Sequence, residues 1–409
     1  MDTEPSNTFD TLQLHPNLLK GIHDLGFLHP TPVQTQAIPH ILAGRDVIGC
    51  AQTGTGKTAA FVLPILHRLL GGTSGKHVRA LIIAPTRELA LQSMDHLKAL
   101  SRYVHLKGSA IFGGVPMNPQ ITALAHGVDI ISATPGRLLD HIYSGRIDFV
   151  DLEVVVLDEA DRMLDMGFLP DIRKILRLLP PTHQTLMFSA TMPPEILKLA
   201  QEFLDHPQMV QVGHRSAPAV GIRHAVYPVP RHLKTELLVE LLRGQAMTSV
   251  LVFARTKRSA DHLGHDLLRR GIRASVMHGD RSQDQRLRAL DQFRYGDSQV
   301  MVATDIAARG IDVDDISHVI NYDVPATPEE YVHRSGRTAR AEATGDAFTL
   351  MDSSEEPLVQ DIEQALKRTL PRVTLPHFNY TRAAPPAGPR SHGRSAPRGG
   401  PRRRGGYGR

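Results

Sequence analysis

A glycine-rich segment near the start of the chain carries the residue types that bind phosphate groups. It reads AQTGTGKT over residues 51–58 and follows an apolar run that is typical of a buried strand. Gly54 and Gly56 would let backbone N–H groups curl around phosphate oxygens. Lys57 can neutralise the β- and γ-phosphates, and the Thr58 hydroxyl can ligate Mg²⁺. The segment begins with alanine where the commonest pattern has glycine, so a plain glycine-rich turn stays open as the alternative.

A pair of acids at the end of another apolar run is the second candidate. The segment reads VVVLDEAD over residues 154–161. Asp158 can hold Mg²⁺ through its water shell, and Glu159 can polarise the water that attacks the γ-phosphate. Acidic residues are also favoured at helix N-termini, so the pair alone does not identify an enzyme. Together with the glycine-rich segment it favours an ATPase or GTPase.

A glutamine close to the N-terminus is a candidate for recognising a purine. Gln34 ends the segment GFLHPTPVQ at 26–34, and an isolated aromatic residue, Phe9, lies upstream. A carboxamide can both donate to and accept from the adenine edge, while an aromatic ring can stack on the base. Taken alone, the segment is better explained as a proline-rich turn that caps a helix.

A basic segment in the second half of the chain could also meet phosphate. It reads YVHRSGRTAR over residues 331–340, and its three arginines, Arg334, Arg337 and Arg340, recur near one helical face. Fixed guanidinium groups suit a phosphoryl transition state or an RNA backbone. A solvated basic helix face is the alternative that this segment alone does not exclude.

These segments must be positioned by strands and helices, and the apolar pattern predicts two sets of strands. Runs that are apolar nearly without interruption are typical of parallel strands buried on both faces. The first set lies at 46–51, 80–84, 128–132, 154–157 and 185–188, and the second at 249–253, 273–277, 299–303, 318–321 and 347–351. Amphipathic stretches such as 87–103 and 355–368 predict helices. The chain is therefore predicted to be α/β, with two domains joined within the proline-rich segment 206–230.

Composition narrows the function classes further. The chain has 409 residues and a net charge of +5, but residues 381–409 hold eight arginines and no Lys, Asp or Glu. This tail of Arg, Gly and Pro cannot bury a core and is predicted to be disordered, whereas the rest of the chain is slightly acidic. No apolar run approaches the ~18 residues of a membrane span, and the N-terminus has no secretory signal pattern. The single cysteine, Cys50, cannot form an internal disulfide. We therefore expect a cytoplasmic protein with no membrane contact.

Eleven short motifs, in order, carry a family resemblance. They are the glutamine motif at 26–34, AQTGTGKT at 51–58, PTRELA at 85–90, GG at 113–114, TPGR at 134–137, DEAD at 158–161, SAT at 189–191, VFART at 252–256, QDQR at 283–286, ATDIAARGID at 303–312 and HRSGRTAR at 333–340. With them the chain resembles a DEAD-box ATP-dependent RNA helicase of superfamily 2, and most resembles the bacterial RhlE-like branch. The resemblance implies two tandem RecA-like domains, with ATP and RNA bound across the cleft.

The resemblance also implies domain boundaries and residue roles. The expected divisions are a glutamine-motif segment at 7–35, an ATP-binding domain at 36–210, a linker at 211–230, a second domain at 231–375 and the tail at 381–409. The catalytic group would be Lys57, Asp158, Glu159, Arg337 and Arg340, with the two arginines supplied by the second domain. ATP would be held by Phe9, Phe27, Gln34, Ala51, Gln52, Thr53, Gly54, Thr55, Gly56, Lys57, Thr58 and Asp312, and Mg²⁺ by Thr58 and Asp158. RNA would contact Arg87, Gly114, Thr134, Gly136, Arg137, Gln283, Arg286, Thr304 and Arg309. Coupling to the closed state would use Ser189, Thr191 and His333.

The implied activity is RNA-stimulated ATP hydrolysis coupled to local unwinding of short RNA duplexes or to remodelling of RNA–protein complexes. RNA would be read through its backbone and ribose hydroxyls, largely without sequence preference. An ATP-gated RNA clamp and a DNA helicase remain the rival functions. The chain is expected to be a monomer, and partners among ribosomal or RNA-decay proteins stay open.

Overall fold

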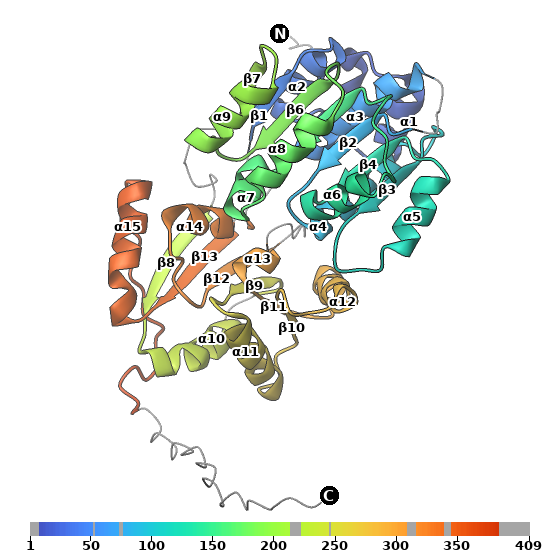
Figure 1. The fold of residues 1–409 in the computed structure, drawn as a ribbon. Helices are drawn as coiled ribbons and strands as arrows, with labels where there is room; N and C mark the ends of the chain where they lie inside the picture. Colours follow the sequence, from blue (N-terminus) through green and yellow to red (C-terminus); the bar gives the residue numbers. More distant parts are fainter. Residues whose placement is uncertain are drawn as a thin grey trace, which may run out of the picture.

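The chain folds into two α/β domains, each built on one sheet (Figure 1). The computed structural model describes residues 8–51, 54–72, 77–212, 222–244, 247–308, 316–338 and 345–383. None of the helices in this part of the chain is long and apolar enough to cross a membrane.

Among the described residues of the first domain, seven strands pair in parallel, in the order β3-β4-β2-β5-β6-β1-β7. Their bounds are β1 Val47–Cys50, β2 Ala80–Ile83, β3 Gly108–Ile111, β4 Ile130–Ala133, β5 Val154–Leu157, β6 Gln184–Ser189 and β7 Gln208–Gln211. In β5, Val154 and Val156 belong to one hydrophobic core, while Val155 and Leu157 belong to another. Burial on both faces explains why this strand is apolar without interruption.

Helices cover both faces of the first sheet. One core is formed by η1, α1, α2, α3 and α4, and the opposite core by α6, α7, α8 and α9. The bounds are η1 Phe9–Leu12, α1 Pro16–Asp24, α2 Pro32–Leu42, α3 Lys57–Leu70, α4 Arg87–Leu100, α5 Asn118–Ala125, α6 Pro135–Tyr143, α7 Ala160–Asp165, α8 Leu169–Leu178 and α9 Pro194–Phe203.

In the part of the second domain that the structure describes, six parallel strands follow the order β10-β11-β9-β12-β13-β8. The strands are β8 Ile222–Pro228, β9 Val250–Phe253, β10 Ala274–Met277, β11 Val300–Ala303, β12 His318–Asn321 and β13 Gly345–Met351. The helices are η2 Arg231–Leu233, α10 Lys234–Gly244, α11 Lys257–Arg269, α12 Gln283–Arg294, α13 Asp305–Ala308, α14 Pro328–Ser335, η3 Ser353–Glu355 and α15 Glu356–Leu366. Both predicted sets of strands are thus confirmed, with ends that shift by one or two residues.

The boundaries of the second domain differ from the sequence prediction. Residues 222–228, which were expected in the linker, form β8 and pair with β13 along its whole length. This strand alternates buried and less buried residues at the sheet edge and ends in proline, so it lacks the continuous apolar run of the other strands. Beyond the expected end at 375, Phe378 and Tyr380 still pack against the core of this domain. Residues 213–221 of the expected linker and 384–409 of the expected tail lie outside the described residues.

The sequence motifs follow the carboxyl ends of the strands. In the first domain they follow β1, β2, β4, β5 and β6, and in the second domain they follow β9 and β11. Carboxyl ends of parallel strands meet at one sheet edge, which is where α/β proteins bind ligands. The two edges face each other, because Arg162 after β5 lines the same pocket as Phe253 and Asp305 of the second domain.

Candidate active site and RNA interface

The glycine-rich loop and Gln34 are joined by hydrogen bonds. Gln34 Nε2 donates to the Gly56 carbonyl over 3.0 Å, and Gln34 Oε1 accepts from the Thr31 N–H over 2.9 Å. Gly56 has a φ of 88°, and a Cβ there would lie 2.5 Å from Gln34 Nε2. Glycine is therefore required by packing as well as by conformation. Each amide atom has a second hydrogen-bonding position, so Gln34 can hold the loop and still face a base.

Lys57 lies at the start of α3 and is 6% exposed. Its Nζ donates to the Ala51 carbonyl over 2.7 Å, which holds the ammonium over the loop. Gly54 adopts a φ of 83°, and Thr58 follows Lys57 on the first turn of the helix. Free N–H groups at such a helix start favour an anion. A phosphate group would compete with Ala51 for the ammonium of Lys57.

Asp158 and Glu159 are almost completely buried where β5 ends. Burial and the adjacent Glu159 carboxylate raise the pKa of Asp158 to about 7, against the opposing charge of Lys57. Two buried carboxylates side by side repel each other when both are ionised, so a nearby cation stabilises them. The described residues contain no group of three His, Cys, Asp or Glu side chains that could hold a metal alone. Asp158 and Thr58 carry oxygen atoms of the kind that Mg²⁺ binds together with phosphates and water, and their role as its ligands stays a prediction.

The last acid of the D-E-A-D segment is tied to the segment SAT. Asp161 Oδ2 accepts from the Thr191 N–H (2.7 Å) and the Thr191 hydroxyl (2.8 Å). Ser189 Oγ accepts from the Asp161 N–H over 3.1 Å and donates to the Thr191 carbonyl over 2.7 Å. Although burial opposes ionisation, Lys57, Thr191 and His333 lower the pKa of Asp161. Thr191 thus contacts the Asp161 carboxylate, Ser189 contacts the Asp161 N–H, and His333 lies near enough for its charge to act on this carboxylate.

Glu159 is held by a neighbour that the sequence reasoning did not single out. Arg162 Nη1 donates to Glu159 Oε2 over 2.7 Å, and both side chains are 5% exposed. The signal available in the sequence was their spacing of three residues at a helix start, which places two side chains on one face.

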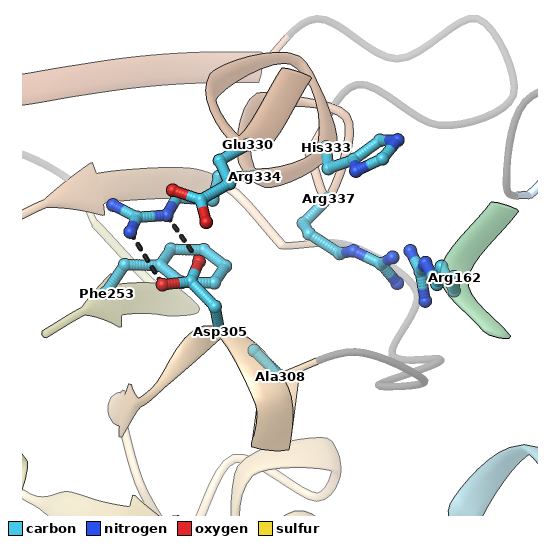
Figure 2. A pocket seen from close by; sticks show the side chains of 8 residues that line it. All are labelled: Arg162, Phe253, Asp305, Ala308, Glu330, His333, Arg334 and Arg337. Carbon is cyan, nitrogen blue, oxygen red and sulfur yellow. Dashed lines mark hydrogen bonds and ion pairs between the residues drawn. The ribbon is translucent and has the colours of Figure 1, made fainter. Parts of the chain in front are cut away.

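The second domain supplies cations to this edge. A pocket between the domains is lined by Arg162 from the first domain and by His333 and Arg337 from the second. Figure 2 shows the guanidinium groups of Arg162 and Arg337 pointing toward each other, with His333 beside them. Arg337 is 3% exposed, so its charge is directed into the cleft rather than into solvent.

Arg334 lines the same pocket, but its guanidinium is engaged differently from that of Arg337, with which the spacing had grouped it. Its guanidinium forms two hydrogen bonds to the Asp305 carboxylate, at 2.6 and 2.7 Å, and another to Asn321 Oδ1 at 3.0 Å (Figure 2). It also lies 4.9 Å above the Phe253 ring. Arg334 therefore fixes α14 inside the second domain and is not available to phosphate.

The two aromatic candidates for adenine differ in exposure. Phe27 is 38% exposed and its ring can stack on a base. Phe9 is 2% exposed and packs in the core of the first domain with Leu12 and Leu18. Nothing in the sequence indicated this burial, and a contact between Phe9 and adenine stays a prediction.

Four of the predicted RNA contacts of the first domain line one groove. These are Arg87, Thr134, Gly136 and Arg137, and Gly113 of the GG pair lines it too. Gly114 has a φ of 73°, and a Cβ there would lie 2.0 Å from Arg87 Nη2. The second glycine of the pair thus lets the Arg87 guanidinium lie against the backbone. Thr134 and Gly136 open α6, whose first N–H groups suit a phosphate.

The Arg137 guanidinium is occupied within the first domain. It donates twice to the Val115 carbonyl over 3.2 Å and reaches Gln120 Oε1 at 3.4 Å. Gln120 also accepts from His141 and donates to the Phe112 carbonyl over 2.9 Å. Arg137 therefore supports the turn that contains the two glycines, and its contact with RNA stays a prediction.

A polar cluster at the groove joins the two domains. Glu88 Oε1 accepts from Gln283 Nε2 over 3.1 Å, and Glu88 Oε2 lies 2.9 Å from Arg286 Nη2. Arg87 Nη1 is 3.5 Å from Gln283 Oε1. Two predicted RNA contacts of the second domain, Gln283 and Arg286, thus share the carboxylate of Glu88 in the first domain, which is 3% exposed. Sequence reasoning missed Glu88, and the acid within the motif PTRELA was the available signal.

Several predicted residues stay untested by this geometry. Thr304 caps α13 and is 8% exposed, at the end of β11. Gln52, Thr53, Arg309, Asp312 and Arg340 lie outside the described residues.

Comparisons with known proteins agree with this geometry. The DEAD/DEAH box helicase family model matches residues 31–199, and the helicase conserved C-terminal domain model matches residues 233–342. The chain is 43% identical over 369 residues to the DEAD-box ATP-dependent RNA helicase CshA of Bacillus cereus, a match that covers 90% of this chain and 70% of that protein. The chain belongs to the DEAD-box family of ATP-dependent RNA helicases.

Solved structures also match the fold of this chain over both domains. A Saccharomyces cerevisiae Dbp5 variant bound to RNA and ADP BeF3 has a TM-score of 0.82, at 31% identity, and the match covers 90% of this chain and 96% of that chain. A Dbp5 variant bound to Nup159, Gle1, IP6 and ADP scores 0.62, at 30% identity, over 89% and 96% of the chains. The narrower assignment to the RhlE-like branch stays a prediction.

Proposed function

We propose that this chain hydrolyses ATP in the cleft between its domains and uses the closed arrangement to separate short RNA duplexes or remodel RNA–protein complexes. The observation that carries the proposal is that two junctions span the same cleft. Arg337 faces the acid site at one junction, and Glu88 binds Gln283 and Arg286 at the other. Since both junctions need the same placement of the domains, ATP and RNA would favour the same state, and each would raise the affinity of the other.

The acid site is proposed to work by positioning and charge. The loop at Gly54–Thr58 would hold the phosphates, Asp158 and Thr58 would hold Mg²⁺, and the metal would neutralise charge on the β- and γ-phosphates. Glu159 would accept a proton from the attacking water, because its carboxylate lies beside the proposed metal ligand. Arg337, with Arg340, would stabilise charge on the transferred phosphoryl group from the second domain.

RNA is proposed to lie along the groove beside Arg87, Thr134 and Gly136. These groups present guanidinium and backbone N–H donors, which suit phosphates rather than base edges. We therefore propose backbone-read, largely sequence-independent binding, in a cytoplasmic and monomeric protein. Ribosomal or RNA-decay proteins are the partner classes we propose.

Strand displacement tests this function. A short RNA duplex with a single-stranded extension should separate with ATP and Mg²⁺ but much less with a non-hydrolysable ATP analogue. Displacement that is equal with the analogue would favour an ATP-gated clamp. ATPase stimulation by single-stranded RNA should exceed that by DNA of the same sequence, and equal stimulation would favour a DNA helicase.

A further inference from the structure

Arg162 is an unusual residue for its position in the fold. Glu159 is the N-cap of α7, which makes Arg162 the third residue of the helix. A cation in the first turn is disfavoured by the helix dipole, and burial to 4% exposure disfavours it further. A buried ion pair rarely adds net stability compared with apolar packing, so fold stability alone is a weak reason for this arginine.

The contact it makes is with the proposed base. Arg162 Nη1 meets Glu159 Oε2 at 2.7 Å, and within the described residues no other side chain is hydrogen-bonded to this carboxylate. Glu159 has a φ of 53°, so its side chain leaves the chain at a sharp turn between β5 and α7. One oxygen of Glu159 is thus fixed, and the other is left to accept a proton from water.

The pairing also determines what Arg162 does not do. Its guanidinium lines the cleft pocket and points toward Arg337 (Figure 2). Because it is bound to Glu159, its charge is balanced within the first domain. Arg337 of the second domain lines the same pocket, and Arg162 serves the carboxylate.

We propose that Arg162 is a positioning residue that fixes Glu159 for attack of water on the γ-phosphate. The proposal rests on the proposed function, in which Glu159 is the base. When a catalytic group is displaced by about 1 Å, the reaction rate can fall roughly 10²-fold. Fixing one oxygen of the Glu159 carboxylate can therefore account for a large part of the rate that the base contributes.

The test measures steady-state ATPase activity of the full chain at saturating RNA, together with KM for ATP. Arg162→Gln should lower kcat by roughly 10-fold to 10²-fold with an unchanged KM for ATP. Arg162→Lys, which keeps the charge, should recover part of this loss. The matched control is Arg79→Gln, since Arg79 is 7% exposed in its side chain and pairs with Glu153 at 2.7 Å away from the site.

A double variant separates this proposal from its rivals. If Arg162 acts through Glu159, Arg162→Gln should cost nothing further in a Glu159→Gln background. Multiplying losses, or a raised KM for ATP, would mean that Arg162 acts on ATP directly and would overturn the proposal. Unfolding of both Arg162 variants while the Arg79 control stays folded would show a structural role and would also overturn it. Wild-type turnover in Glu159→Gln alone would instead show that Glu159 is not the base. The proposed function would then lack the residue that accepts the proton from water.

Discussion

The two domains share a parallel-sheet architecture but present different chemistry to the cleft. The first domain offers a phosphate loop and two buried acids, Asp158 and Glu159. The sequence of the second domain has no such loop and instead directs Arg337 into the cleft. Each face is incomplete, because Arg162 of the first domain is paired with Glu159 and the second domain has no nucleotide loop of its own. Catalysis can therefore be controlled by domain placement alone.

Two arginines of the second domain sharpen this contrast. Arg334 and Arg337 are three residues apart and line the same pocket, yet the guanidinium of Arg334 is bound within the domain by Asp305 and Asn321, while that of Arg337 points toward the first domain. Arg334 fixes the position of α14, and this position places Arg337 at the cleft. Charge type and spacing did not separate the two, because Asp305 and Asn321 are brought to Arg334 by the fold.

The largest expected effect is at Arg337. Arg337→Ala should lower RNA-stimulated kcat by roughly 10³-fold, because it removes a cation from the transferred phosphoryl group. Turnover at saturating RNA and ATP measures this, with Arg269→Ala on the exposed end of α11 as the control. Near wild-type turnover in the Arg337 variant would mean that Arg337 of the second domain supplies no catalytic charge to the cleft.

A smaller effect is expected at the RNA-side junction. Glu88→Gln keeps the shape of the side chain but removes the charge that faces Arg286. A hydrogen bond to a charged group is worth about 1.5–3 kcal/mol, so the RNA concentration for half-maximal ATPase should rise roughly 10-fold or more. The control variant Glu195→Gln, at an exposed position of α9, should leave this RNA concentration unchanged. If the RNA dependence of the ATPase were unaltered in both variants, Glu88 would not stabilise the closed state.

The smallest effect concerns stability and lies away from the cleft. Burial and the charge of Arg368 lower the pKa of His224 to about 4, and its Nδ1 lies 2.8 Å from the Tyr331 hydroxyl. The folded pKa is below the unfolded value of 6.5, so the unfolded state binds more protons between these values and stability is lost as pH falls. From pH 7 to pH 5 the free energy of unfolding should drop by about 2 kcal/mol from this group.

Denaturant unfolding followed by circular dichroism measures this loss, since the chain has no tryptophan. His224→Gln should show a smaller drop, and exposed His206→Gln should behave as wild type. An equal drop in all three proteins would assign the acid sensitivity to other groups.

Sequence reasoning found the strands that are buried on both faces, because these leave a continuous apolar run. It missed β3, β7 and β8, which lie at sheet edges and are only partly buried, so they lack a continuous apolar run. It found the loop and the acids, which are local in sequence. It did not find Glu88 or the pairing of Arg162, because burial and partners brought together by the fold decide those roles.

The central claim is that ATP and RNA favour one closed arrangement. The most direct test measures the dissociation constant of a non-hydrolysable ATP analogue with and without saturating single-stranded RNA, and that of RNA with and without the analogue, at one fixed salt concentration. The account predicts that both affinities rise by the same factor, about 5- to 150-fold, and that Arg337→Ala or Glu88→Gln reduces this factor. An ATP-analogue affinity that RNA leaves unchanged would contradict it.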